Sequence, residues 1–325
     1  MTTNSEIVYW IALTQIPRWG NARINTLLTT IFQEEKISLE EFFNFSEKEW
    51  GQKYKLSPPD CVNIQAAKNE LPNYSFLLED LLSQGFEIIP VSSSEYSSTL
   101  KENLKPTHAP PLLYLKGNKK ILHENSIAIV GSRDASDIAL RFTDNIARLA
   151  TQQYKVVVSG FAKGVDKQAL DSSLKYKGHS IIVLPQGVMT FGSGIKKYYS
   201  QIVEGDVLVL STFFPKAPWS AQLAMARNPI IYGLAKEIYV AESQNKGGTW
   251  AGVIDGLRKG RTIYVRNPEP NETNANKLLI EKGATAVDFD GRPIIMKYQE
   301  TKQESLIVAE PKEKKINPSS QTNLF

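Results

Sequence analysis

The chain has 325 residues, 42% of them hydrophobic and 22% charged, with a formal net charge of +4. This composition excludes a chain that is disordered throughout, and the single Cys61 excludes an internal disulfide and fits a reducing compartment. No apolar run is long enough to span a membrane and no secretory pattern opens the chain, so we expect a cytoplasmic protein without a membrane partner.

The first segment, residues 1–70, has a helical and polar-rich pattern. Apolar residues gather in 7–13 and again in 24–32, and Pro17 and Gly20 interrupt the pattern between them. We therefore predict two helices joined by a turn, within a small helical domain. Such a hairpin either presents its turn amides to a DNA phosphate or serves only for helix packing.

The next segment, residues 71–122, is predicted to form a short βαβ unit. Leucines in 76–82 suit a helix, and the apolar run 86–89 suits a strand. Several prolines then impose an extended chain before a second apolar run at 112–115.

From residue 127 onward, apolar runs of strand length alternate with helical patterns. The predicted strands cover 127–130, 156–159, 181–184, 207–210, 238–241 and 262–265. This alternation predicts an α/β fold, an extended Rossmann-like doubly wound parallel sheet over residues 71–290. Residues 291–325 are rich in Lys, Glu, Gln and Pro and are predicted to be a disordered tail.

Small, polar and basic residues follow the carboxyl ends of these strands. Gly131-Ser132-Arg133 follows the first, Gly160 to Gly164 the second and Lys246 to Thr249 the fifth. Ser136 or Asp137 is placed to cap the helix after the first strand. Since parallel strands end at one edge, these loops favour an anion-binding cradle, although a structural turn with a solvent-facing arginine is the alternative.

The sequence offers binding features rather than a catalytic set. Cations at Arg133, Lys163, Arg227 and Lys246 are predicted in loops or at helix starts, with aromatic residues near them in sequence. Cations beside aromatic faces are typical of single-strand binders, whereas core packing is the other explanation for each aromatic residue. These aromatic residues are Phe161, Phe213, Phe214, Trp219 and Trp250.

No cofactor or metal site is predicted. The three histidines are scattered without metal-ligand spacing, and the dinucleotide fingerprint and the P-loop pattern are both absent. Asp166 stands near a predicted helix start, where a capping role and a catalytic role are both open.

The ordered motifs resemble the DprA/Smf family of bacterial DNA-processing proteins. The motifs are Val130-Gly131-Ser132-Arg133, then Ser159 to Asp166, then Arg227-Asn228-Pro229-Ile230-Ile231. The chain resembles a divergent member, because Pro229 stands where that family usually has a second arginine.

The resemblance implies a non-enzymatic protein that binds single-stranded DNA and passes it to the RecA recombinase in natural transformation. It also implies a homodimer and a helical N-terminal domain of the SAM or helix-hairpin-helix type. The implied DNA-binding residues are Gly131, Ser132, Arg133, Ser159, Gly160, Lys163, Gly164, Arg227, Asn228, Lys246, Gly247, Gly248 and Thr249.

The end of the chain resembles a short peptide that docks on the bacterial sliding clamp. Leu324 and Phe325 would fill an apolar groove, and Gln321 would hydrogen-bond at its rim. We therefore predict the clamp as a further partner, with an unspecific tail as the alternative.

Two other functions use the same scaffold. One is a nucleotide hydrolase similar to the LOG phosphoribohydrolases, although Gly247-Gly248-Thr249 lacks the proline and glutamate that flank their motif. The other is a sensor that holds a free nucleotide in the same cradle.

Overall fold

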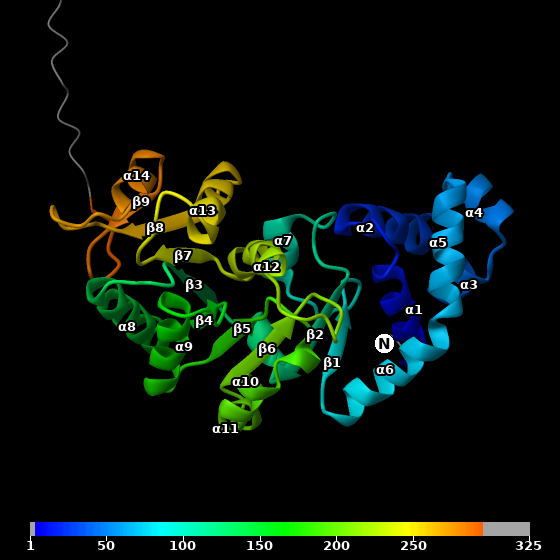
Figure 1. Ribbon diagram of the computed structural model, residues 1–325, viewed down its shortest axis with the longest axis horizontal. Helices are drawn as coiled ribbons and strands as arrows, with labels where there is room; N and C mark the ends of the chain where they lie inside the picture. The colour runs from blue at the N-terminus through cyan, green and yellow to red at the C-terminus, as the bar shows by residue number, and fades with distance from the viewer. Residues whose placement is uncertain (1–3, 295–325) are drawn as a thin grey trace, which may run out of the picture. The chain divides into compact units, whose positions relative to one another are not determined.

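The computed structural model describes residues 4–294, which contain a nine-stranded sheet (Figure 1). The strand order is β1-β2-β6-β5-β4-β3-β7-β8-β9. The strands are β1 (Glu87–Pro90), β2 (Leu112–Gly117), β3 (Ser126–Val130), β4 (Val156–Ser159), β5 (Ser180–Val183), β6 (Val207–Ser211), β7 (Glu237–Val240), β8 (Thr262–Arg266) and β9 (Thr285–Val287).

Helices precede the sheet and connect its strands. The helices before β1 are α1 (Asn4–Thr14), α2 (Asn21–Thr29), α3 (Leu39–Asn44), α4 (Glu47–Tyr54), α5 (Pro58–Asn69) and α6 (Leu71–Ser83). Those within and after the sheet are α7 (Ser98–Leu104), α8 (Asp137–Gln152), α9 (Val165–Lys175), α10 (Gly192–Lys197), α11 (Tyr199–Glu204), α12 (Ala221–Leu234), α13 (Gly248–Arg258) and α14 (Asn276–Glu281).

The parallel part of the sheet is doubly wound from its central strand, β3. From β3 the chain adds β4, β5 and β6 on one side, then crosses through α12 to add β7, β8 and β9 on the other. The order therefore reverses between β3 and β7, which is where doubly wound sheets bind their ligands. The predicted α/β fold with a mostly parallel sheet is confirmed.

The edge formed by β1 and β2 differs from the prediction. β1 pairs with β2 antiparallel, and β2 pairs with β6 antiparallel, so the predicted βαβ unit in residues 71–122 is wrong. A βαβ crossover would have made the two strands parallel, whereas α7 here packs beside α12 and the chain returns in the opposite direction. The short β9 was not predicted from the sequence.

Both faces of the sheet are covered, which explains the continuous apolar strands. Ile127, Ile129 and Val157 pack against α8 and α9, whereas Ala128 and Val130 face the core shared with α7, α12 and α13. Every residue of β3, β4, β5 and β6 is buried. Such strands lack the alternation of apolar and polar residues that is typical of a sheet with one face in solvent.

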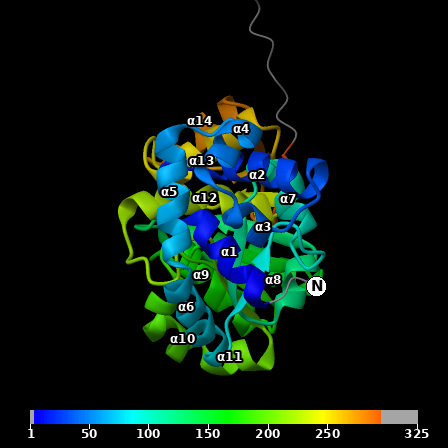
Figure 2. The same cartoon turned by 90° about the vertical axis from the view of Figure 1, so that its right-hand side faces the viewer.

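The N-terminal helices lie toward the viewer in Figure 2, and α1 packs against β1 and β2. The predicted pair of helices is present as α1 and α2. The buried side chain of Asn25 on α2 donates hydrogen bonds to the carbonyls of Pro106, Thr107 and Ala109, which ties the helices to the loop before β2. We propose the helical domain as residues 1–70 and the Rossmann-like domain as residues 71–290; both boundaries stay predictions.

The last described residues are still hydrogen-bonded to β9, at the end of the sheet. The Ile294 amide donates to the Ala286 carbonyl at 2.8 Å, and Pro293 forms a bridge with Val287. The predicted clamp peptide, Gln321, Leu324 and Phe325, lies outside the described residues.

Candidate nucleic-acid interface

The loop after β3 is fixed by its neighbours and leaves Arg133 exposed. A Cβ atom on Gly131 would lie 2.5 Å from Val165 Cγ2, so no side chain fits there. The Ser132 amide donates to the Glu242 carbonyl at 2.9 Å, and Ser136 caps α8 as predicted. Arg133 makes no ion pair with any of residues 4–294 and is free to bind an anion.

The loop after β4 packs directly on the loop after β3. Gly164 has a φ of +83°, and a Cβ atom there would lie 2.3 Å from the Ser132 carbonyl oxygen and 2.5 Å from that of Arg133. The Lys163 ammonium contacts the Asp134 carboxylate at 2.9 Å, and both side chains are largely exposed. An exposed pair of this kind contributes little stability, so an incoming phosphate can compete for Lys163.

Replacing Gly164 with alanine is expected to destabilise the protein by about 2–4 kcal/mol, because positive φ and a backbone clash act together. Gly247→Ala is the matched control, since Gly247 has a φ of +91° but nothing within 4 Å of a new Cβ. Urea denaturation of both variants measures the difference. Equal losses would show that the two loops are not in close contact.

Arg227 and Asp166 form a buried pair beneath these loops. Arg227 is 4% exposed and Asp166 is 8% exposed, and their charged groups lie 3.8 Å apart. Arg227 Nη1 donates to the Val183 carbonyl at 3.2 Å, and a Cβ atom on Gly160 would lie 1.2 Å from Nη1. Gly160 is therefore required so that the guanidinium can lie against the backbone.

The position of Arg227 corrects one prediction from the sequence. Arg227 lies in the middle of α12 and is buried, whereas a loop or helix start was predicted. Burial raises the pKa of the Asp166 carboxyl above its ordinary value, and the guanidinium of Arg227 together with amides of Gly160 and Ala162 opposes that rise. Burial also lowers the pKa of Arg227. Arg227 and Asp166 therefore lie beneath the loop after β4 and contact its backbone at Gly160.

The loop after β7 lies beside the loop after β3, at the carboxyl ends of the parallel strands. Thr249 donates its hydroxyl to the Gly131 carbonyl at 3.0 Å, and Asn228 of α12 donates to the Gly248 carbonyl at 3.4 Å. Lys246 and Gly247 are exposed. Both α9 and α13 begin after a glycine, Gly164 and Gly247, with no side-chain cap. The first amides of α9 already donate to the carbonyls of Ser132 and Ala162, whereas the first amides of α13 keep the partial positive charge of a helix N-terminus, which suits an anion.

These elements enclose a cavity of about 390 Å³ at the strand-order reversal, which we name the switch cavity. Nine of the predicted residues line it, namely Gly131, Ser132, Arg133, Arg227, Asn228, Lys246, Gly247, Gly248 and Thr249. A neighbouring depression of about 530 Å³ is lined by Arg133, Lys163 and Gly164, among others. Arg133 lines both, so the structure brings Arg133 and Lys163 together as expected.

Two predicted residues lie at neither cavity. The Ser159 hydroxyl is buried and donates to the Ile129 carbonyl at 3.1 Å, and Gly160 lies against Arg227. The sequence analysis did not identify Tyr232, Met225 or Gln244, which also line the switch cavity. No local signal identifies them, because α12 and the loop after β7 bring them there only in the folded chain.

The predicted aromatic residues divide between core and surface. Phe161 packs edge-on against Phe191 and Tyr198, with ring centroids 5.0 and 5.7 Å apart, so core packing explains it. Trp219 is 54% exposed just before α12. Trp250 packs partly buried against the core of the α12 face.

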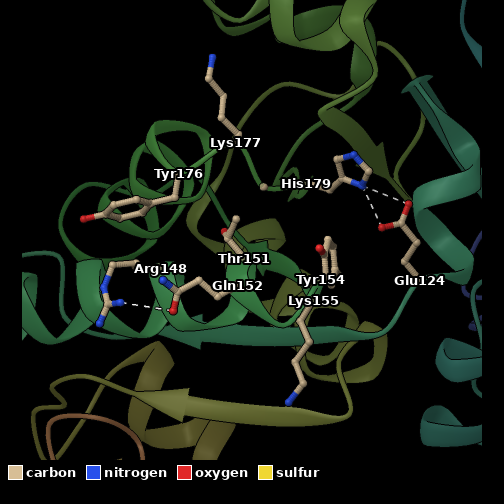
Figure 3. Close-up of a pocket in the computed structure, with 10 residues that line it drawn as sticks. Glu124, Arg148, Thr151, Gln152, Tyr154, Lys155, Tyr176, Lys177 and His179 are labelled. Carbon is tan, nitrogen blue, oxygen red and sulfur yellow. Dashed lines mark hydrogen bonds and ion pairs between the residues drawn. The ribbon is translucent and has the colours of Figure 1, made fainter.

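Another cavity, of about 710 Å³, lies at the amino ends of the parallel strands, away from the switch cavity (Figure 3). Glu124, Lys155 and His179 line it just before β3, β4 and β5 begin, so it lies at the amino ends of these strands. His179 Nδ1 and the Glu124 carboxylate are 2.8 Å apart, and Lys155 pairs with Glu237. Arg148 and Lys177 also line this cavity and make no ion pair with any described residue, so only part of its charge is paired.

Within residues 4–294, no helix combines the length and apolar character needed to cross a bilayer. The same residues contain no group of three or more His, Cys, Asp or Glu side chains placed to hold a metal ion.

Comparison with known proteins shows a family match. The model of the family described as DNA recombination-mediator protein A matches residues 87–299. The DNA processing protein DprA of Bacillus subtilis is 27% identical over 211 residues, which cover 63% of this chain and 70% of that protein. The DprA of Streptococcus pneumoniae is 31% identical over 157 residues, which cover 48% of this chain and 55% of that protein.

Solved structures agree on the fold. The structure of Streptococcus pneumoniae DprA matches with a TM-score of 0.71 at 23% identity, over 88% of this chain and 94% of that one. Helicobacter pylori DNA processing protein A, described by its single-stranded DNA binding mode, matches with a TM-score of 0.53 at 22% identity, over 62% of this chain and 90% of that one.

Proposed function

Because this chain belongs to the DNA recombination-mediator protein A family, we propose that it binds single-stranded DNA through the loops at the carboxyl edge of its sheet. One observation supports the proposal most strongly. Arg133, Lys163 and Lys246 are exposed cations from the loops after β3, β4 and β7, and they gather around the switch cavity and the depression beside it.

The chemistry of this edge suits a phosphate backbone. Arg133 offers a planar fork of donors, and the uncapped start of α13 offers backbone amides. The Ser132 amide is already bonded to Glu242, so we assign only its hydroxyl to the DNA. Contacts of this kind neutralise phosphates and position a strand without reading its sequence.

We propose binding without catalytic turnover. Asp166 is the carboxylate that lines the switch cavity, and it is held by Arg227 and by backbone amides. A carboxylate paired in this way is suited to positioning Arg227 and the loop after β4. The nucleotide-hydrolase alternative needs a free carboxylate at this edge.

We further propose that the chain acts as a homodimer and passes its strand to the RecA recombinase in natural transformation. The family's description as a recombination mediator supports the passage of a strand to a recombinase, and the homodimer depends on the resemblance of the sequence motifs. The clamp peptide at Gln321, Leu324 and Phe325 is a separate proposal that depends on the sequence alone.

The proposed function is tested by gel shift with single-stranded and double-stranded oligonucleotides at several salt concentrations. We expect the single strand to bind more tightly, because a cavity of about 390 Å³ admits part of one backbone but not a duplex. Affinity should fall steeply with salt as phosphate contacts release counterions. Equal binding of the duplex, or an affinity that salt does not change, would contradict the proposal.

A further inference from the structure

The loop between β8 and α14, residues 267–275, lies against the loop after β7, and we name it the β8 loop (Figure 1). The Ala275 amide donates to the Ser243 carbonyl at 2.7 Å, and the Ser243 amide donates to the side-chain carbonyl of Asn276 at 2.9 Å. Both backbone polar groups of the buried Ser243 are therefore bonded to residues at the end of the β8 loop.

The side chain of Asn276 joins the ends of two strands to the loop after β7. Asn276 is fully buried, and its Nδ2 donates to the Ala241 carbonyl at 3.1 Å and to the Arg266 carbonyl at 2.9 Å. Since Oδ1 accepts from Ser243, each polar atom of this side chain has a partner. A buried polar network in which every group is paired holds its members in one arrangement.

A buried ion pair fixes the β8 loop to the end of the sheet. Arg266 Nη1 donates to the Glu272 carboxylate at 2.7 Å, and Arg266 Nε donates to the Ala241 carbonyl at 3.0 Å. The guanidinium keeps the pKa of the Glu272 carboxyl below its ordinary value, so the pair is charged at neutral pH. Because loss of one partner would leave a buried charge, the β8 loop is held firmly on β7 and β8.

The exposed part of the loop after β7 is short and is held at both ends. Residues 244–247 are exposed, and Lys246 among them lines the switch cavity. Ser243 holds one end of this segment, and Thr249, which donates to the Gly131 carbonyl, holds the other. Fixing both ends reduces the conformations that the segment loses when it binds a ligand. The anchor at Ser243 therefore determines how well Lys246 is placed for a phosphate.

We propose that Asn276 is a positioning residue for DNA binding, which holds Lys246 at the switch cavity through Ser243. This inference rests on the proposed function. Asn276 is fully buried and does not line the switch cavity, so it acts only through the loop after β7. Glu242 is held separately, because its carbonyl accepts the Ser132 amide, and the loop after β3 should therefore stay in place without Asn276.

The test is a double-mutant cycle in the full chain with Asn276→Ala and Lys246→Ala. Asn103→Ala is the matched control, because Asn103 also donates to two backbone carbonyls, those of Gly233 and Ala235 before the amino end of β7. Fluorescence anisotropy with oligo-dT at several salt concentrations measures the affinity and its salt dependence. Urea denaturation measures the stability of each variant.

Asn276→Ala and Lys246→Ala should each weaken binding of oligo-dT roughly 3- to 10-fold, which is the range of one hydrogen bond. Each should also reduce the slope of log affinity against log salt by about 0.7, the value of one phosphate contact on a single strand. The double variant should bind no more weakly than the weaker single variant, because both changes remove the same contact. Asn103→Ala should lower the urea midpoint, as Asn276→Ala does, but leave affinity and slope unchanged.

Glu272→Gln is a second variant, which covers the case that Asn276→Ala does not fold. It keeps the shape of the side chain and removes its charge, so it loosens the β8 loop while Asn276 keeps its own hydrogen bonds. We expect a smaller loss of affinity, roughly 2- to 3-fold, with the same dependence on Lys246.

Several results would overturn the inference. If the losses of the two single variants multiply in the double variant, Asn276 does not act through Lys246. If Asn276→Ala or Glu272→Gln lowers the urea midpoint but not the affinity, the β8 loop serves folding only. An equal loss of affinity in Asn103→Ala would show a general effect of lower stability. If the unchanged protein binds no oligo-dT at all, the proposed function itself is wrong.

Discussion

Replacing Arg133 with glutamate is expected to lower the affinity for single-stranded DNA about 100-fold at low salt. The change removes a charge-assisted contact, for which about 1.5–3 kcal/mol is typical, and adds repulsion between the new carboxylate and the phosphates. Because Arg133 is exposed and has no ion-pair partner within residues 4–294, folding should be unaffected. Fluorescence anisotropy with an oligonucleotide measures the affinity.

Two further variants make this test specific. Lys163→Glu should have a smaller effect, since Lys163 already shares its charge with Asp134. Lys236→Glu is the matched control, because Lys236 is exposed, binds Asn125 and lies before β7 at the opposite edge of the sheet. If Lys236→Glu weakens binding as much as Arg133→Glu, only the net charge matters and the cradle assignment fails.

Replacing Arg227 with methionine is expected to destabilise the protein by about 3–5 kcal/mol, because Asp166 is left buried without its cation. Arg227 Nη1 also holds the Val183 carbonyl at the end of β5. Urea denaturation measures the free energy of unfolding. Adding Asp166→Asn to Arg227→Met removes the unpaired charge and should recover part of the loss.

The loss caused by Arg227→Met should depend on pH. Burial already raises the pKa of Asp166 above its ordinary value of 3.8, and without the guanidinium it should rise further. Between the unfolded and folded pKa values the folded state binds more protons, so stability falls as pH rises. The variant should therefore be closest to the unchanged protein near pH 4 and furthest from it at neutral pH. A loss independent of pH would mean that lost packing, not charge, causes it.

The apolar strands and their loops could be predicted because they are local features. Runs such as 127–130 are apolar throughout because both faces of the sheet are covered, and the turn Gly131-Ser132-Arg133 follows directly in the sequence. Parallel strands then bring their loops to one edge, whatever residues lie between them. This is why most of the predicted cradle residues line the switch cavity.

The remaining features depend on contacts between distant parts of the chain. Nothing near Arg227 in the sequence indicates that it is buried against Asp166, which comes from the helix after β4. β2, which pairs antiparallel with β1, joins the sheet by pairing antiparallel with β6, which comes much later in the chain.

The central claim is that the carboxyl edge of the sheet holds the backbone of a single DNA strand. A crystal structure of the full chain with a short oligo-dT tests it most directly. We expect phosphate oxygens within hydrogen-bonding distance of the Arg133 guanidinium and of the amides that begin α13. A strand bound instead at the amino edge, in the cavity of Figure 3, would contradict the account.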